Sequence, residues 1–165
     1  MDLSWRKAQM EDATLLWRWA NDPGTRQNSF SKAPIPYLYH VAWLESQLQS
    51  TAATIWIFSD GSGPAGLVRC EVAGQEAEIH ITVAPDRRGR AYGKAMLTRA
   101  LRLLREERGD YVRVKALVLD HNLPSLRLFK ACGFQEVSAG ERANGERVVL
   151  LELMDDRGEA RRIWR

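Results

Sequence analysis

Residues 76–108 place a strand, a proline, a basic glycine-containing loop and a long helix in direct succession. The alternation over residues 76–83 predicts a strand, and Pro85 ends it because proline cannot continue a hydrogen-bonded ladder. From Ala91 to about Arg108 the apolar residues recur at helical spacing, which predicts the strongest helix of the chain. A strand that leads into a helix through a short loop favours an α/β fold, in which helices cover a sheet.

The segments on either side extend this pattern. Strands are predicted at residues 3–8, 54–58, 65–71, 111–119, 134–138 and 147–154, and helices at about residues 11–21, 40–49 and 122–132. Residues 25–38 contain two prolines and many polar groups, so we predict a loop or a broken helix there. The expected organisation is one domain with a mixed α/β sheet over residues 1–154, followed by a basic C-terminal tail over residues 155–165.

Composition excludes several classes of protein. The chain has 165 residues, of which 45% are hydrophobic and 27% charged, which is ordinary for one soluble domain. No stretch approaches the roughly 18 to 20 apolar residues of a membrane helix, and charges interrupt the N-terminal apolar runs, so we expect no signal peptide and a cytoplasmic protein. The net charge of +3 is too mild to indicate nucleic acid. Cys70 and Cys132 lie too far apart in sequence for metal-ligand spacing, so we expect reduced thiols and no metal.

The loop between the predicted strand and the long helix has the composition of an anion site. Arginines and a tyrosine alternate with small residues over residues 88–93, and Lys94 follows. The first turn of a helix carries unpaired N–H groups and partial positive charge, while small residues let a phosphate approach the backbone. The alternative is a solvent-facing basic turn at a helix entry.

Two motifs together resemble the GNAT family of N-acetyltransferases. Arg88, Ala91 and Gly93 fall on the family pattern Arg/Gln-x-x-Gly-x-Gly/Ala, with alanine replacing the middle glycine. Residues 122–134 resemble the downstream pattern Asn-x-x-Ser/Ala…Tyr-x-x-x-Gly-Phe, with Phe129 replacing the tyrosine. The resemblance implies a GNAT-type α/β domain, with a mixed, mostly antiparallel sheet of six to seven strands flanked by about four helices. It implies acetyl-CoA as cosubstrate, bound by Ile81, Thr82, Val83, Arg88, Gly89, Arg90, Ala91, Tyr92, Gly93, Lys94, Asn122 and Ser125.

The reaction that this resemblance implies is direct attack of a primary amine on the acetyl-CoA thioester. The backbone N–H of Val83 is expected to stabilise the oxyanion. Strand alternation places Glu78 and His80 on one face, where they are candidates for deprotonating the amine, although a plain solvent-facing strand edge explains them equally well. Phe129 cannot donate a proton to the leaving thiol, so either none is needed or Tyr92 or water supplies it.

The N-terminal third of the chain contains Trp-x-Asn-Asp at residues 19–22, then an arginine and a serine, and His-x-x-Trp at residues 40–43. This pattern resembles that of nucleotide-aminosugar N-acetyltransferases of pseudaminic-acid-type pathways. This resemblance implies a nucleotide-linked 4-amino sugar as acceptor, contacted by Trp19, Asn21, Arg26, Ser29, Phe30, His40 and Trp43. The alternative is that the tryptophans are core anchors of two helices. A protein N-terminal or ribosomal-protein acetyltransferase, and an acyl-CoA-binding module without catalysis, are competing functions. We expect a small-molecule partner and neither nucleic acid nor membrane, and we allow for a homodimer.

Overall fold

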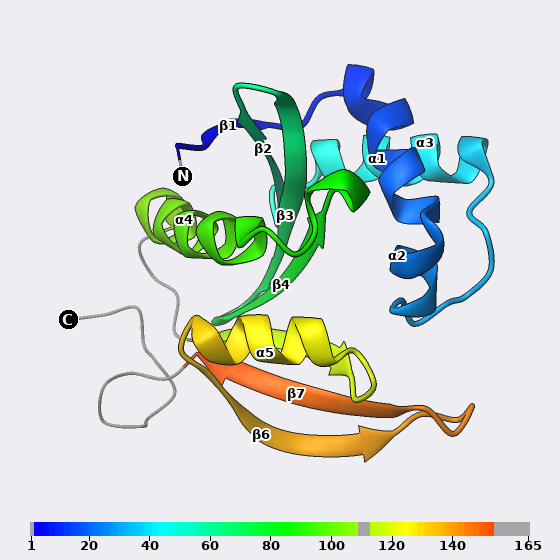
Figure 1. Ribbon diagram of the computed structural model, residues 1–165, viewed down its shortest axis with the longest axis vertical. Coiled ribbons are helices and arrows are strands. Elements are labelled where there is room, and N and C mark those ends of the chain that lie inside the picture. Colours follow the sequence, from blue (N-terminus) through cyan, green and yellow to red (C-terminus); the bar gives the residue numbers. More distant parts are fainter. Residues whose placement is uncertain (1, 109–112, 154–165) are drawn as a thin grey trace.

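The computed structural model describes residues 2–108 and 113–153, and in them the chain forms one seven-stranded mixed sheet (Figure 1). The strand order is β1-β2-β3-β4-β5-β7-β6. Every neighbouring pair is antiparallel except β4 and β5, which are parallel. The strands are β1 Ser4–Lys7, β2 Ala53–Asp60, β3 Gly63–Ala73, β4 Glu76–Val83, β5 Arg113–Leu119, β6 Phe134–Glu141 and β7 Arg147–Leu153.

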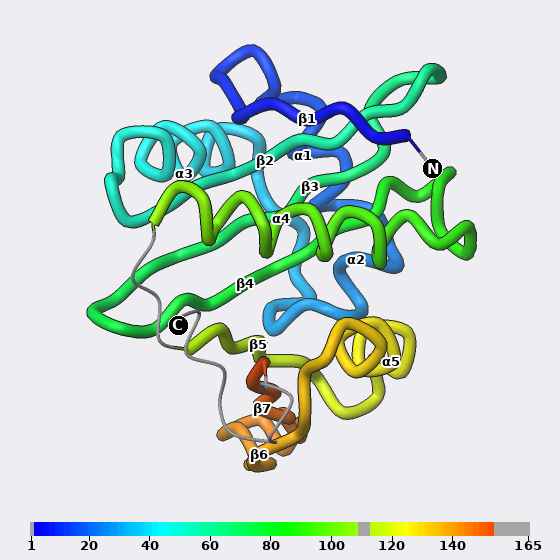
Figure 2. The backbone as a smooth tube through the Cα atoms, turned by 90° about the vertical axis from the view of Figure 1, so that its left-hand side faces the viewer, coloured from blue at the N-terminus to red at the C-terminus, as the bar shows by residue number. Residues whose placement is uncertain are grey.

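Five α-helices accompany the sheet in the described residues. They are α1 Ala13–Asn21, α2 Pro23–Gln27, α3 Tyr37–Gln49, α4 Tyr92–Arg108 and α5 Leu123–Ala131, with short 3-10 turns at Met10–Asp12 and Pro85–Arg87. Figure 2 shows α4 crossing in front of β2, β3 and β4, with α1 and α2 behind them. No helix in the described part of the chain is both long and apolar enough to cross a membrane.

The predicted fold class is confirmed, and the sequence prediction differs mainly between residues 22 and 39. The expected loop or broken helix begins with a true helix, α2, because Asp22 caps it and Pro23 occupies its first turn. Helix α3 starts at Tyr37, directly after Pro36 and three residues before the predicted start. The tail at residues 155–165 lies outside the described residues.

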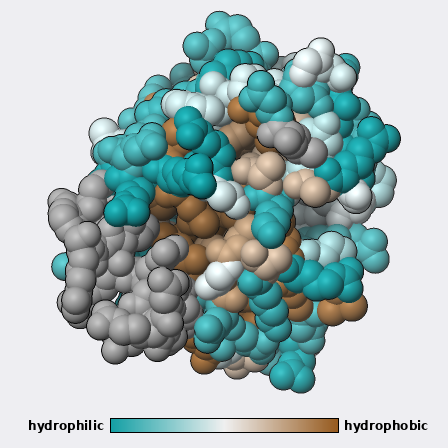
Figure 3. Space-filling view, turned by 60° about the vertical axis from the view of Figure 1, so that its left-hand side comes forward, coloured by the Kyte–Doolittle hydropathy of each residue, from teal (hydrophilic) through white to brown (hydrophobic). Residues whose placement is uncertain are grey.

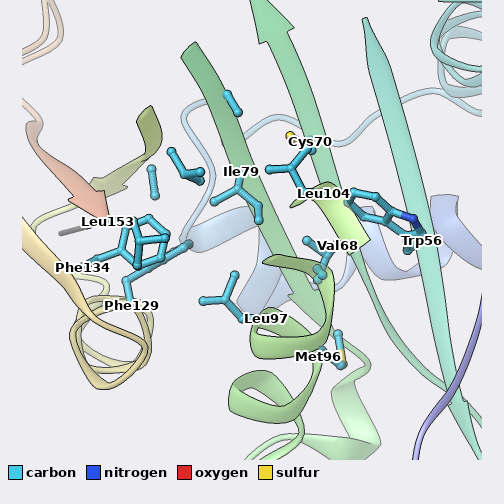
Figure 4. Packing of buried hydrophobic residues seen from close by; sticks show 14 of the residues in the cluster. Trp56, Val68, Cys70, Ile79, Met96, Leu97, Leu104, Phe129, Phe134 and Leu153 are labelled. Carbon is cyan, nitrogen blue, oxygen red and sulfur yellow. The ribbon is translucent and has the colours of Figure 1, made fainter. Parts of the chain in front are cut away.

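Two hydrophobic clusters lie on opposite faces of the sheet. The larger lies beneath α4 and α5 and contains Trp56, Val68 and Ile79 of the sheet, together with Leu97 and Phe129 of these helices (Figure 4). The smaller lies beneath α1 and α3 and is formed by Ala8, Ala13, Leu16, Trp19, Leu44, Ile55, Ile57 and Ala84. Each fully buried large apolar side chain stabilises the fold by about 1.5–3 kcal/mol, so these clusters fix which face of β4 looks toward which helices.

The sheet opens between β4 and β5. Their register contains only three pairs, Glu76–Arg113, Ala77–Val114 and Glu78–Lys115. Beyond Glu78 the two strands no longer pair, although β4 continues to Val83 and β5 to Leu119. The backbone edge of β4 is therefore unpaired on its β5 side over five residues.

Candidate active site

The unpaired edge of β4 presents its backbone groups at alternate residues. The Ala84 N–H donates to the Ala65 carbonyl at 2.9 Å, which fixes the phase of the β3–β4 ladder. Because hydrogen-bonded and non-bonded pairs alternate in an antiparallel ladder, the N–H and C=O groups of Ile79, Ile81 and Val83 point away from β3 and into the opening. The expected backbone contacts of Ile81 and Val83 with the cosubstrate fit this geometry. The expected contact of Thr82 does not, because its backbone groups face Leu67 of β3.

Apolar side chains lie beside the opening. Ile81 and Val83 of β4 and Leu126 and Leu128 of α5 are only partly buried and pack against the larger core cluster. Figure 3 shows hydrophobic side chains gathered in the middle of one face of the molecule, framed by hydrophilic ones. A chain of methylene and amide groups suits such an edge, with polar groups along β4 and apolar flanks.

The loop between β4 and α4 has the conformation of an anion cradle. Gly89 and Ala91 both adopt positive φ, 74° and 62°. Residues in the left-handed region turn successive N–H groups toward one point, and the first turn of α4 contains no acidic residue. A Cβ on Gly93 would lie 2.9 Å from the Leu128 Cδ2, so glycine at this position lets the Leu128 side chain of α5 pack directly against α4. The expected pyrophosphate site from Gly89 to Gly93 therefore fits the backbone.

Arg88 lies in this loop but its side chain points to α2. Its guanidinium lies 2.7 Å from the Asp22 carboxylate and donates to the Thr25 hydroxyl at 3.0 Å. Both contacts hold the guanidinium against α2. In this arrangement Arg88 does not point toward a phosphate at the N-terminus of α4. Arg90 in the loop and Lys94 in the first turn of α4 are both exposed, which leaves these two cations for a phosphate.

Tyr92 is a core residue and not a proton donor at the opening. Its side chain is buried in the larger cluster, and its hydroxyl donates to the Asp60 carboxylate at the end of β2. The Arg87 guanidinium lies 6.0 Å from the Tyr92 ring and 3.8 Å from Asp60. The bond to Asp60 raises the pKa of the tyrosine, with burial acting in the same direction. Only the backbone of Tyr92 remains for the cosubstrate.

Glu78 and His80 lie together where β4 and β5 separate. The His80 Nε2 is 3.1 Å from a Glu78 Oε1, and both side chains are about a third exposed, at 32% and 28%. The contact with His80 lowers the pKa of Glu78 despite opposition from burial, and Lys115 and Arg69 act in the same direction as His80. A carboxylate that stays ionised accepts the Nε2 hydrogen and leaves Nδ1 as the free acceptor of the ring.

A cavity of about 340 Å³ adjoins this pair on the α3 side. Three carboxylates and one ammonium group are among its lining residues, which are Gln47, Ser50, Ala52, Ala53, Glu71, Val72, Ala73, Glu76, Glu78 and Lys115. Glu76 is already paired with Lys115 at 2.7 Å and with Arg113 at 2.6 Å. Glu71 is paired with Arg69, and Glu78 with His80, so each of the three carboxylates has a partner within the protein. The Glu71 side chain is the most exposed of the three, at 43%.

The contacts of Asn122 and Phe129 in α5 are structural. The Asn122 side chain accepts a hydrogen bond from the Ser125 N–H at 3.3 Å and so caps the helix. Phe129 is 2% exposed, and its ring meets that of Phe134 edge-on with 5.0 Å between centroids. The phenylalanine at position 129 has no proton to give to a leaving thiolate. Ser125 is half-buried, and its expected contact with CoA stays a prediction.

Four of the expected acceptor residues hold α1, α2 and the loop after α2 together. Trp19 is buried in the smaller cluster. Asn21 accepts from the Ile35 N–H at 2.7 Å and donates to the Ile35 carbonyl at 3.1 Å. Arg26 donates to the Ser31 carbonyl at 3.1 Å and to the Ser29 hydroxyl at 3.0 Å. Arg26 was expected to meet a diphosphate, but these bonds engage its guanidinium within the protein.

The other three expected acceptor residues differ in access. His40 is buried at 3% exposure, which lowers its pKa, and its Nε2 has no hydrogen-bond partner among the described residues. Phe30 is 36% exposed beneath the Arg142 guanidinium, 4.7 Å from its ring centroid. Trp43 is 37% exposed, with Arg69 5.5 Å from its ring. Phe30 and Trp43 are thus the two that a ligand can reach.

Sequence reasoning missed the residues that hold Arg88 and two that line the cavity. Asp22 and Thr25 bind Arg88, and Glu71 and Lys115 line the cavity. The pair Asp22-Pro23 is a helix-start signal that could have revealed α2 and its cap. Nothing in the local sequence of Glu71 or Lys115 indicates that they line one cavity, because β3 and β5 are brought to either side of β4 only by the sheet.

Comparison with known proteins gives the same fold. The spermidine N-acetyltransferase from Vibrio cholerae, solved with CoA and spermine, superposes with a TM-score of 0.81 at 17% identity, covering 91% of this chain and 94% of that chain. A GNAT-family acetyltransferase from Streptococcus pneumoniae has a TM-score of 0.73 at 18% identity, covering 92% and 98%. A domain from Methanocaldococcus jannaschii has a TM-score of 0.76 at 20% identity, covering 92% and 99%.

Sequence comparison identifies the family. No curated protein sequence matches the chain. The sequence profile described as "Acetyltransferase (GNAT) family" matches residues 13–134, which is most of the chain and includes both the loop before α4 and helix α5. The protein therefore belongs to the acetyltransferase (GNAT) family and is an acyl-CoA-dependent N-acetyltransferase.

Proposed function

We propose that this enzyme transfers the acetyl group of acetyl-CoA to a small primary amine that approaches from the α3 side of β4. The observation that carries the proposal is the separation of β4 from β5 directly after Glu78. It puts an unpaired backbone edge and the Glu78–His80 pair at the same point of the sheet. A thioester and an amine can meet there from opposite faces.

The donor side of the site is built from backbone and cations. Acetyl-CoA supplies the reactive thioester. The N–H groups of Ile81 and Val83 face the opening and can donate to the pantetheine arm and to the developing oxyanion, with Val83 as the proposed oxyanion donor. The positive φ loop at Gly89 and Ala91, with the N-terminus of α4, offers N–H groups for the pyrophosphate.

His80 is the proposed base. A protonated amine must lose a proton before it can attack, and an imidazole with a free Nδ1 can take that proton directly or through water. Glu78 fixes the ring by accepting the hydrogen of Nε2 at 3.1 Å. Because the pKa of Glu78 is lowered, its carboxylate is a weak base and is better suited to orienting the ring.

The leaving group needs no tyrosine. An unperturbed thiol has a pKa of about 8.5, so a thiolate is a tolerable leaving group near neutral pH. Phe129 is buried in the core and Tyr92 is bonded to Asp60, so neither takes part in proton transfer. Water at the mouth of the opening is the proposed proton source.

The first candidate acceptor is an aliphatic polyamine. Three of the residues that line the 340 Å³ cavity are carboxylates, and Glu78 links that cavity to His80. A second ammonium group of the acceptor would be attracted to Glu71, whose side chain is 43% exposed and whose carboxylate it would share with Arg69. The structurally similar enzyme from Vibrio cholerae was solved with spermine, which supports the same class.

The second candidate is a nucleotide-linked amino sugar. Phe30, after α2, and Trp43, on α3, are partly exposed aromatic rings, and such rings suit stacking with a base or a sugar. This candidate is weakened by Arg26, whose guanidinium is engaged by the Ser31 carbonyl and the Ser29 hydroxyl. Arg142, above Phe30, would have to replace it as the diphosphate partner.

One assay separates these classes. CoA release from acetyl-CoA is measured with spermidine, a UDP-4-amino sugar and a peptide with a free N-terminus at equal concentrations. We expect the highest kcat/KM with spermidine, and loss of most of that preference in Glu71→Gln. A preference for the UDP sugar would transfer the proposal to the second candidate. A preference for the peptide would overturn both.

A further inference from the structure

Arg88 belongs to the loop before α4, yet it is bonded to the helix that follows α1. Its Nη2 lies 2.7 Å from the Asp22 Oδ2 and 3.0 Å from the Thr25 Oγ1. A Cβ built on Gly24 would lie 2.8 Å from the Arg88 Nη1, so the guanidinium rests directly against the backbone of α2. The contact joins residues that are more than sixty positions apart in sequence.

Asp22 has a second task at the same place. Its Oδ2 accepts a hydrogen bond from the Thr25 N–H at 3.0 Å and so caps α2. Its side chain is 18% exposed, and burial opposes its ionisation. The bonds from Arg88 and Thr25 outweigh burial and keep the pKa of Asp22 below its ordinary value. One carboxylate therefore starts α2 and holds the loop.

The other end of this segment is tied to the opposite half of the sheet. We call residues 22–32 the α2 strap. Lys32 lies 2.8 Å from Glu146 in the turn between β6 and β7, and Arg142 donates to the Phe30 carbonyl at 2.9 Å. The strap thus runs from the loop after β4 to the turn beyond β5, on the far side of the opening (Figure 1).

We infer that Asp22 is a positioning residue that couples the CoA loop to the α2 strap through Arg88. A ligand that orders the loop then also stabilises the strap, and by thermodynamic reciprocity the strap strengthens binding at the loop. The inference rests on CoA binding at this loop, as in the proposed function. It assigns Arg88 to the strap, where the family pattern alone would have aimed it at the phosphates.

Two substitutions at one position separate coupling from helix capping. Asp22→Ser keeps an N-cap hydroxyl and removes the charge that Arg88 meets, whereas Asp22→Ala removes both. We expect both variants to bind CoA about three- to fivefold more weakly in calorimetry, the range of a partly exposed ion pair. Only Asp22→Ala should also lose thermal stability through α2. Glu136→Gln is the matched control, because it removes an exposed carboxylate from an ion pair with Lys130 that lies outside both the strap and the loop, and its affinity for CoA should be unchanged.

A double-mutant cycle tests whether Arg88 transmits the effect. In an Arg88→Gln background, Asp22→Ser should no longer change the dissociation constant for CoA. An unchanged CoA affinity in Asp22→Ser, or an equal effect with and without Arg88, would overturn the inference while leaving the proposed function intact. Failure of the wild-type protein to bind CoA would instead overturn both.

Discussion

His80 and Glu78 point from the same face of β4, and the imidazole Nε2 lies 3.1 Å from a carboxylate oxygen of Glu78. Because the pair sits at the last residue that β4 shares with β5, it occupies the edge of the opening. The lowered pKa of Glu78 keeps the carboxylate ionised, so it directs the free nitrogen of the ring away from itself. The two residues thus have unequal roles.

Substitution of this pair should show that inequality. We expect His80→Gln to lower kcat by about 100-fold or more, because it removes the base, and Glu78→Gln to lower it by about tenfold, because the ring is only misaligned. The measurement is steady-state CoA release with spermidine. His121→Gln is a matched control, since His121 also lies near a carboxylate, 4.0 Å from Asp120, but is exposed. A larger loss in Glu78→Gln than in His80→Gln would reverse the assignment.

Replacing Ala91 with glycine should stabilise the protein. Its φ of 62° is in the left-handed region, which costs an alanine roughly 1–2 kcal/mol, while glycine loses about 0.5–1 kcal/mol in folding entropy. We expect Ala91→Gly to raise the Tm by about 1–3 °C without weakening CoA binding. Ala95→Gly, inside α4, serves as the opposite control and should lower the Tm. A lower Tm in Ala91→Gly would show that the left-handed alanine is not strained.

Phe129→Tyr tests whether a proton donor is needed. The ring is 2% exposed and packs against Phe134, so the new hydroxyl would be buried and should cost about 1–3 kcal/mol of unfolding free energy. Turnover should stay within the same order of magnitude, because the thiolate leaves without a tyrosine. Urea unfolding and CoA release together give both quantities. A collapse of turnover in a variant that remains folded would contradict the proposed departure of the thiolate.

Asp12 should contribute stability that depends on pH. Both of its oxygens accept from Arg6 at 2.7 Å, and one also accepts from the Gln9 N–H at 2.8 Å. The bond from Arg6 is the main cause of its lowered pKa, against opposition from burial. A carboxyl whose pKa is lower in the folded state stabilises the protein above its ordinary pKa and loses that contribution as pH falls through the lowered value.

Asp12→Asn should therefore destabilise the protein at pH 7 by about 1–2 kcal/mol, and the difference from wild type should shrink in acid. Urea unfolding between pH 7 and pH 3 measures it. Glu11→Gln removes a neighbouring exposed carboxylate and should change the unfolding free energy by less than about 0.5 kcal/mol. A deficit that is constant with pH would show that the ion pair contributes nothing.

Most of the fold could be predicted because most of its helices and strands have a clear hydrophobic period within their own sequence. Residues 76–83 alternate cleanly, and the structure has β4 with those bounds. The pairing of Glu78 with His80 follows from alternation alone, since residues two apart share a face. The cytoplasmic location and a homodimer stay predictions.

Side-chain partners far apart in sequence were beyond prediction. Arg26 has the chemistry of a phosphate ligand, but a guanidinium also donates to backbone carbonyls, and the fold places the Ser31 carbonyl within its reach. Trp19 could have been a stacking platform, and its place in the smaller cluster became visible only when α1 and α3 were seen to pack together. Arg88 illustrates the same point, because α2 lies next to it only in three dimensions.

Because β4 and β5 share only three residue pairs, side-chain packing carries much of the link between the two halves of the sheet. Ile79 of β4, Phe129 of α5 and Leu153 of β7 belong to one apolar cluster that spans the two halves (Figure 4). The packing of these three side chains therefore contributes to the width of the opening. A substitution that makes one of them smaller would change the affinity for substrate without removing any direct contact with it.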